Sequence, residues 1–360
     1  MPTPRFTRLV RGLLVAAAAG LGLVTASFAE TKPDNRHLRV TPIDITAKPI
    51  TRFERFGGNT PSLGKLQFRG GLVLTAPGVA NFGGWSGIAL DADGAGFMAI
   101  SDAGAWLRGK IAYAGGAPAG IAAAEIGPIL GVNGKPLTRS RDRDAEAIAL
   151  EGGTVASGTA LVAFERNNRL ARFTVDQSGL ARPLAELEKP AEARRMHGNT
   201  GFEALTVMKG GRYRGRPIAI AERLFDHAGN HTGWIWIDTH PETFHLRNIG
   251  DFDITDVASL DDGTLFVLER RFRWLDGVKM RIRRIPASAL QPGVTLDGEI
   301  LIEADLEDEI DNMEGIDATR TPAGEVILTV ISDDNFNHML QRNLLLQFAV
   351  PRADTAKARP

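Results

Sequence analysis

Cysteine is absent from the whole 360-residue chain. The protein can therefore form no disulfide, hold no metal through thiolates and use no thiol nucleophile, and it has no cysteine for a lipid anchor. Its fold must be stabilised by a hydrophobic core alone, and a chain of this length is long enough to bury one.

Basic clusters and long apolar runs are also missing. The formal net charge is −1, and no run of Lys and Arg has the density that follows a phosphate backbone, so we expect no nucleic-acid partner. After the first 29 residues, no apolar stretch reaches the roughly 20 residues that a membrane-spanning helix needs. We therefore expect no membrane association once those residues are removed.

The first 29 residues have the pattern of a cleavable export signal. Three arginines precede an apolar run over residues 12–25, and Ser27 and Ala29 supply small residues at both positions that a signal peptidase reads. We predict cleavage after Ala29 by the general secretory route. The expected location is the periplasm, with release from the cell as a variant.

One short pattern recurs five times in the remaining chain. A polar or acidic residue is followed by a small or β-branched residue and then by Ile, Leu or Val. The copies are residues 85–89, 145–149, 202–206, 255–259 and 313–317. Their polar positions, which we take as Ser86, Glu146, Glu203, Asp256 and Glu314, are 53 to 60 residues apart. A near-constant period of this length indicates a repeated structural unit.

Each copy leads through a turn into further short, strand-like runs. The second run of each unit ends in an acid, a third run follows in every unit, and four units add a fourth. Four strands per unit form a blade of a β-propeller. The fold class is therefore predicted as all-β, a β-propeller of four-stranded blades with five clear repeats.

The N-terminal part of the mature chain bears on the closure of the ring and on the number of blades. The fifth unit ends after three strands, and residues 66–74 can supply the fourth, which closes the last blade. Residues 39–46 and 50–56 can add strands to a sixth blade, so both five and six blades stay open. We divide the chain into a signal (1–29), an N-terminal extension (30–65), the propeller domain (66–350) and a flexible tail (351–360).

Antiparallel pairing brings the acids together. The start of the first strand of a unit lies beside the end of the second, so acids at both points meet on one face of the disc. The expected pairs are Glu146 with Glu165, Glu203 with Glu222, Asp256 with Glu269, and Glu314 with Asp333, while Ser86 faces Asp102. The gap beside Ser86 and Asp102, where one acid is missing, is the first place where we expect a ligand.

Two interpretations of these carboxylates stay open. Arg166, Arg223 and Arg270 each follow an acid and point to the other side of the strand, which favours an inter-blade ring of salt bridges. Alternatively, the oxygen ligands form a hard-cation site suited to Ca²⁺. The candidate metal ligands are Asp102, Glu146, Glu165, Glu203, Glu222, Asp256, Glu269, Glu314 and Asp333.

Other catalytic patterns are weak. Residues 333–337, which include Asn335, form the densest group of oxygen donors but lack the spacing of an EF-hand loop. The seven histidines show no zinc spacing, and no G-x-S-x-G motif is present, although Ser86 is a serine at a rim position. We therefore assign no catalytic residue from these patterns.

These motifs resemble those of the phytase-like family, also described by an esterase-like activity of phytase. The resemblance spans residues 66–350. It rests on residues 84–87, 144–148, 201–205, 311–316 and 332–337, followed by Gln341 and Arg342. It implies a propeller similar in shape to the calcium-dependent β-propeller phytases, which use bound Ca²⁺ and basic side chains to hold and hydrolyse phosphomonoesters.

The resemblance implies an exported, metal-assisted hydrolase of phosphate or carboxylic esters, lactones included. Ca²⁺ ions on the carboxylates would bridge the substrate and activate a water. Substrate oxygens would be bound by Arg166, Arg223 and Arg270, with Asn335 and Ser86 as further substrate-binding residues. The alternatives are a non-catalytic binding propeller with a salt-bridged or Ca²⁺-stabilised rim, and a purely structural one. We expect a small-molecule ester or phosphate as partner and no obligate protein partner.

Overall fold

The computed structural model describes residues 32–56, 62–198 and 200–351. The predicted export signal and most of the predicted C-terminal tail lie outside these residues. Within the described part, no helix has both the length and the apolar character needed to cross a bilayer.

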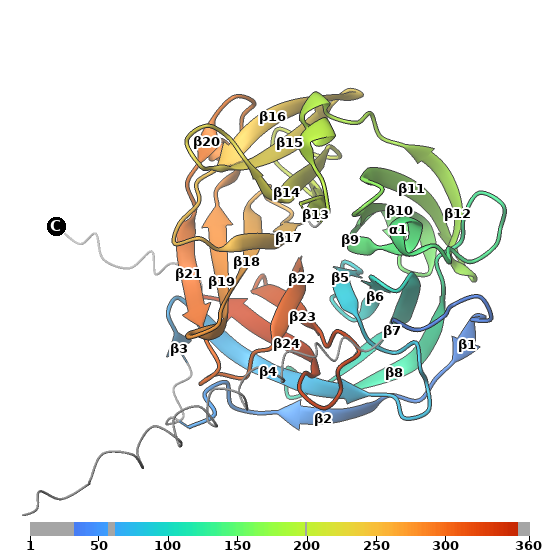
Figure 1. Ribbon diagram of the computed structural model, residues 1–360. Coiled ribbons are helices and arrows are strands. Elements are labelled where there is room, and N and C mark those ends of the chain that lie inside the picture. Colours follow the sequence, from blue (N-terminus) through green and yellow to red (C-terminus); the bar gives the residue numbers. More distant parts are fainter. Residues whose placement is uncertain (1–31, 57–61, 199, 352–360) are drawn as a thin grey trace, which may run out of the picture. The chain divides into compact units, whose positions relative to one another are not determined.

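Five sheets, antiparallel apart from one short strand, follow one another around a ring, so the predicted propeller is confirmed and has five blades (Figure 1). Blade one contains β5 (Trp85–Leu90), β6 (Gly96–Ser101), β7 (Ala105–Ala114) and β8 (Ala117–Pro128). Blade two contains β9 (Ala145–Thr154), β10 (Ser157–Phe164), β11 (Arg169–Asp176) and β12 (Gly179–Glu186). A short helix, α1 (Ser140–Arg143), connects the two blades.

Blades three and four are linked by a short strand, which lies between two strands of blade four in the sequence and pairs with blade three. Blade three contains β13 (Phe202–Val207), β14 (Pro217–Phe225), β15 (His231–Ile237) and β16 (His240–Leu246). Blade four contains β17 (Asp253–Ser259), β18 (Leu265–Arg273), β19 (Gly277–Ile285) and β21 (Glu299–Ala304). Between β19 and β21, the chain returns to blade three as β20 (Thr295–Leu296), which pairs in parallel with β16.

Blade five closes the ring. It contains β22 (Asn312–Arg320), β23 (Val326–Asp333), β24 (Asn343–Val350) and, as its fourth strand, β4 (Leu66–Thr75). The predicted closure by an N-terminal strand is therefore confirmed.

The N-terminal extension extends existing blades and forms no sixth one among the described residues. Strand β1 (Thr41–Pro42) pairs with β8 at the edge of blade one, β2 (Thr46–Ile50) pairs with β4, and β3 (Ser62–Leu63) also pairs with β4. These strands cover outer edges that would otherwise present unpaired backbone groups.

The core consists of five apolar layers, each between two neighbouring blades. One layer, for example, joins Phe266 and Ile282 of blade four to Leu328 and Phe348 of blade five, and all four side chains are fully buried. The alternation of side chains along a strand supplies both faces of each sheet with apolar residues, so every blade contributes to two layers.

The innermost strands of blades one, two and five approach one another at the axis almost without intervening side chains. A Cβ atom added to Gly87 would lie 2.9 Å from the Cα of Ala147, and one added to Gly315 would lie 2.9 Å from the Cα of Gly87. These are backbone contacts that no side-chain rotation can relieve. The small residues therefore set the spacing of the strands that carry the site described below.

Replacing Gly87 by alanine is expected to destabilise the protein by about 1–3 kcal/mol, because the added methyl group forces two inner strands apart. Chemical denaturation of the purified domain measures this difference. Gly120→Ala is the matched control, since a Cβ there meets nothing within 4 Å. Equal stability of the two variants would contradict the tight approach at the axis.

Candidate functional site

A β-bulge recurs at the same place in the innermost strand of every blade. Near its N-terminal end, each of these strands leaves one residue unpaired against the second strand of its blade. The five bulge residues are Ser86, Glu146, Glu203, Thr255 and Glu314. A bulge re-aims a side chain relative to the sheet, and four of these five side chains line one central cavity, Thr255 being the exception.

A second ring of residues lies at the end of the second strand of each blade. On the second strand, one residue pairs with the residue that precedes the bulge, and the ring member is the next residue along this second strand. The five members are Asp102, Glu165, Glu222, Arg270 and Asp333. All five line the same cavity. Both rings thus converge on the mouth of the propeller at the N-terminal ends of the inner strands.

In blade four, the bulge and the second-ring position are each displaced by one residue from the prediction. The register aligns Ile254 with Glu269 and Asp256 with Leu268, so the bulge is at Thr255 and the second-ring position is Arg270. The predicted meeting of Asp256 with Glu269 at the mouth is therefore wrong. The correct register could have been found from the sequence, because an apolar residue precedes each bulge. This residue is Trp85, Phe202 or Met313 in other blades and Ile254 in blade four.

The carboxylate of Asp256 lies buried beneath the mouth. It accepts backbone N–H groups from Leu205 (3.3 Å), Val257 (2.8 Å) and Ile316 (2.9 Å), which belong to blades three, four and five. Asp256 occupies the position that is Gly or Ala in the other blades, so it links three inner strands. Its oxygens are used by these donors and do not line the cavity.

The carboxylate of Glu269 faces away from the mouth as well. It is fully buried and pairs within blade four with Arg283 and with Arg281, the latter at 3.3 Å. A buried carboxylate held by two guanidinium groups has a structural role in the blade. Blade four thus contributes no acid to either ring.

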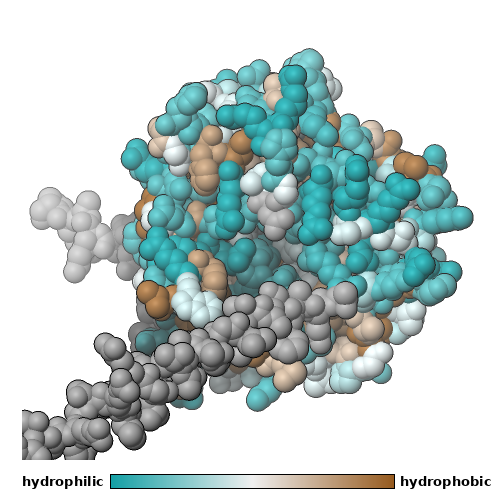
Figure 2. Space-filling model, viewed as in Figure 1, coloured by the Kyte–Doolittle hydropathy of each residue, from teal (hydrophilic) through white to brown (hydrophobic). Residues whose placement is uncertain are grey.

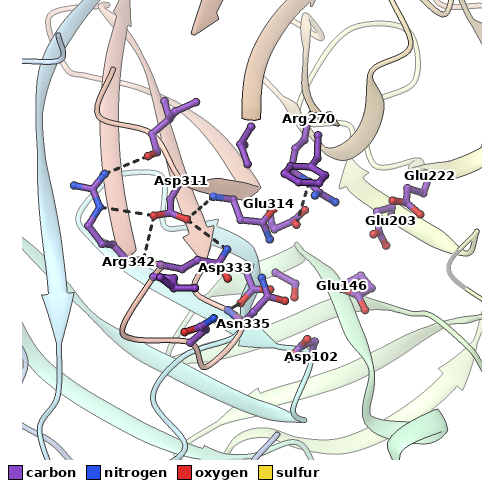
Figure 3. Close-up of a pocket in the computed structure, with 18 of the residues that line it drawn as sticks. Asp102, Glu146, Glu203, Glu222, Arg270, Asp311, Glu314, Asp333, Asn335 and Arg342 are labelled. Atoms are coloured by element: carbon purple, nitrogen blue, oxygen red, sulfur yellow. Dashed lines mark hydrogen bonds and ion pairs between the residues drawn. The ribbon is translucent and has the colours of Figure 1, made fainter. Parts of the chain in front are cut away.

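The cavity at the mouth has a volume of about 850 Å³ and is lined by more acidic than basic side chains. Nine carboxylates line it, against five cationic side chains. The carboxylates are Asp102, Asp144, Glu146, Glu165, Glu203, Glu222, Asp311, Glu314 and Asp333. Figure 2 shows mainly hydrophilic residues around the hollow at the centre of this face, and Figure 3 shows several of the acids around it.

Two overlapping groups of three carboxylates have the spacing of a metal site. Asp144, Glu146 and Glu165 each offer one oxygen, all within 4.8 Å of one another, and so do Glu165, Glu203 and Glu222. Glu165 belongs to both groups. The structure therefore brings together the two acid pairs that the sequence predicts in blades two and three, and it adds Asp144, which the sequence analysis did not select.

These acids are poorly compensated by the protein itself. One oxygen each of Glu203, Glu222 and Asp102 is buried without a hydrogen-bond donor among the described residues. Burial, followed by repulsion from neighbouring carboxylates, raises the pKa of Glu146 and Glu203 well above the ordinary value. Burial also raises the pKa of Glu165 to about 6 and that of Glu222 to about 7. A bound divalent cation would neutralise this cluster.

In blade one, where Ser86 stands in place of an acid, the chain's own Lys32 brings a positive charge to the mouth. The Nζ atom of Lys32 lies 2.6 Å from an oxygen of Asp102 and 2.9 Å from one of Asp144. The segment around Lys32 is held in place by Asn35. The buried side chain of Asn35 donates hydrogen bonds to backbone oxygens of blade one and of the loop after it, among them that of Leu137 (2.7 Å). The sequence did not reveal this contact, because Lys32 is 70 residues from Asp102.

The arginines that follow the acids have three different partners. Arg166 pairs with Asp144 at 2.7 Å, Arg270 lies 3.4 Å from Glu314 of the next blade, and Arg223 binds Asp253 of the next blade. Arg166 and Arg270 line the cavity, whereas Arg223 does not. The remaining cations there, Lys32, Arg55 and Arg342, were not selected from the sequence.

The loop after β23 divides its polar residues between structure and site. Asp334 is fully buried and accepts N–H groups from Gly84 (2.9 Å) and Phe336 (3.1 Å), so it joins the loop to blade one. Asn335 lines the cavity, as does Asp333, which accepts the backbone N–H of Asn335 at 2.6 Å. Ser86 also lines the cavity. The roles of these residues in binding remain predictions.

Comparison with known proteins identifies a family. Residues 80–336 match the family model described as "Phytase-like: Esterase-like activity of phytase". None of the curated proteins compared matches the chain in sequence.

Two solved structures illustrate the structural likeness. The chain titled "Structure of U3-55K" is 10% identical with a TM-score of 0.38, and the alignment covers 81% of this chain and 100% of that one. AofleA from Arthrobotrys oligospora is 8% identical with a TM-score of 0.34, covering 80% of this chain and 82% of that one. Likeness at this level says nothing about activity.

Without divalent cations, the protein is expected to lose stability as the pH rises from about 5 to about 8. Because the folded pKa values of Glu165 and Glu222 lie above the ordinary 4.5, the folded state retains protons that the unfolded state has released. The share of these two residues should begin above about pH 4.5, be complete above about pH 7 and amount to roughly 2–4 kcal/mol. Glu146 and Glu203, whose pKa values are raised well above the ordinary value, extend the loss to higher pH.

Thermal unfolding in a chelator across this pH range measures the effect. Glu222→Gln should flatten the curve, because the amide does not ionise, while Glu242→Gln on the exposed face of β16 serves as the control. A melting temperature that rises with pH equally in all three proteins would contradict the prediction.

Proposed function

The chain belongs to the phytase-like family, and from this premise we propose that it is a metal-assisted ester hydrolase. It would hold Ca²⁺ at the acidic mouth and act on phosphate or carboxylic esters. On the pattern of the first 29 residues, which lie outside the described part, we also propose export to the periplasm.

The observation that carries the proposal is the pair of carboxylate groups that share Glu165. An all-oxygen donor set with several buried negative charges suits a hard divalent cation such as Ca²⁺. Among the described residues that line the cavity, none is histidine, so the set does not resemble a zinc site. The oxygens of Glu203 and Glu222 that accept no hydrogen bond are available as metal ligands.

The cation, when bound, would neutralise charge on the substrate, polarise its P–O or C–O centre and lower the pKa of a water. The protein's own cations lie around the same cavity. Glu314 raises the pKa of Arg270, so this side chain stays charged and can bind a substrate oxygen. Arg342 lies across the cavity from Glu203 and Glu222, next to Asp311 (Figure 3).

A second candidate function is a non-catalytic binding propeller. The ion pairs of Lys32 with Asp102, of Arg166 with Asp144 and of Arg270 with Glu314 favour it, because they neutralise part of the rim without a metal. In this case the mouth would bind a ligand and turn nothing over.

Millimolar Ca²⁺ is expected to raise the melting temperature of the chelator-treated protein, because binding to the folded state stabilises it. Glu165→Gln removes a ligand common to both groups and should weaken Ca²⁺ binding by about tenfold or more. Glu242→Gln should bind as the wild type does. Isothermal titration with Ca²⁺ measures both affinities.

Activity is assayed in parallel on p-nitrophenyl phosphate and p-nitrophenyl acetate. Turnover that disappears in chelator and returns with Ca²⁺ supports the hydrolase. Stabilisation by Ca²⁺ without turnover of either ester favours the binding propeller, and the absence of any Ca²⁺ effect at millimolar concentration contradicts the metal site.

A further inference from the structure

The cavity at the mouth has an apolar wall on one side. This wall is formed by Phe272, Val278, Leu306, Ile310 and Leu340, which line the same cavity as the acids. The first two belong to the β18–β19 hairpin of blade four, the next two to the connection from β21 to β22, and the last to the loop before β24. The two carboxylate groups lie in blades two and three instead.

Parts of the wall are in direct contact. Phe272 and Val278 are cross-strand partners in the hairpin. Leu306 covers the hairpin turn closely, because a Cβ added to Gly277 would lie 2.7 Å from its Cδ1 atom. The hairpin and the connection from β21 to β22 thus pack together, and the loop before β24 adds Leu340 to the lining of the same cavity.

Three of the five wall residues are exposed to solvent, whereas Ile310 is buried and Val278 half-buried. Phe272 is 58% exposed, Leu306 46% and Leu340 80%. An exposed apolar patch that borders a concave site is a common feature of ligand-binding sites. These side chains therefore indicate a bound apolar group.

The register connects the wall to the charged part of the site. Arg270 and Phe272 are two residues apart on β18, so their side chains lie on the same side of the strand. An anionic group held by Arg270 would place a substituent on its outer side against Phe272 and Val278. Charge and apolar surface are thus arranged for one molecule that carries both.

We propose that the apolar wall is the subsite for the alcohol part of the substrate, which would be an aryl or alkyl monoester of phosphate. This inference rests on the hydrolase proposed above and names its substrate class. In the reaction, water supplies the hydroxyl group that bonds to phosphorus, the P–O bond to the alcohol breaks, and the apolar alcohol leaves with a proton. A small polar alcohol such as glycerol leaves the wall without a partner.

The test compares hydrolysis of 1-naphthyl phosphate with that of glycerol 2-phosphate in the Ca²⁺-loaded protein. The wild type is expected to favour the naphthyl ester by about tenfold or more in kcat/KM. Phe272→Ser and Leu306→Ser should each reduce kcat/KM for the naphthyl ester by about tenfold and leave glycerol 2-phosphate within about twofold.

Leu275→Ser is the matched control. Leu275 lies at the tip of the same hairpin, is 93% exposed and is not among the residues that line the cavity. The control should hydrolyse both esters as the wild type does. Equal losses on both esters, or no loss in the wall variants, would overturn the subsite. A shift in gel-filtration volume common to Phe272→Ser and Leu275→Ser, with unchanged ester preference, would assign the hairpin to self-association instead.

A binding measurement separates failure of the subsite from failure of the hydrolase. If no phosphate ester is hydrolysed, the hydrolase proposal fails, and the subsite is tested by the affinity of 1-naphthyl phosphate, followed through its fluorescence. Weaker binding by Phe272→Ser and Leu306→Ser than by Leu275→Ser supports the subsite. Equal binding by all of them overturns it.

Discussion

The pairing of β4 with β24 is the contact on which the rest of the structure depends. It joins Leu66–Thr75 to Asn343–Val350 and thereby completes the last blade with a strand from the start of the domain. Because β4 leads directly into blade one, this pairing ties the first blade to the last and closes the ring. Once it is closed, the five inner strands are held around one axis, and their bulge residues share one cavity.

The same geometry that builds the mouth also creates its electrostatic problem. Repetition of an acidic position, which is harmless in a single hairpin, places like charges from several blades around one cavity. This repulsion is reduced by different residues in different blades. Lys32 compensates part of the charge in blade one and Arg270 replaces an acid in blade four, whereas Glu203 and Glu222 of blade three each keep a buried oxygen that no donor among the described residues reaches. The uncompensated sector of the ring is therefore where a cation gains most.

The proposed function depends on this loss of symmetry. A propeller with five identical blades would offer a uniform acidic rim, which can hold ions but cannot orient a substrate. Here Glu203 and Glu222 of blade three lie across the cavity from Arg342 (Figure 3), and Arg270 leads along β18 to the apolar hairpin of blade four. A mouth whose sides differ in chemistry can bind a molecule in one orientation.

The sequence by itself determined the repeat, the strands of each blade, the closing strand and most of the acids at the mouth. It could do so because strand alternation and antiparallel pairing are local rules, and the period of the motif fixes how often they apply. The tertiary structure alone decided the register of blade four, where Thr255 and Arg270 take the places predicted for Asp256 and Glu269. It also decided the number of blades and the approach of Lys32 to Asp102, because contacts between distant segments depend on how the closed ring packs, which no local pattern encodes.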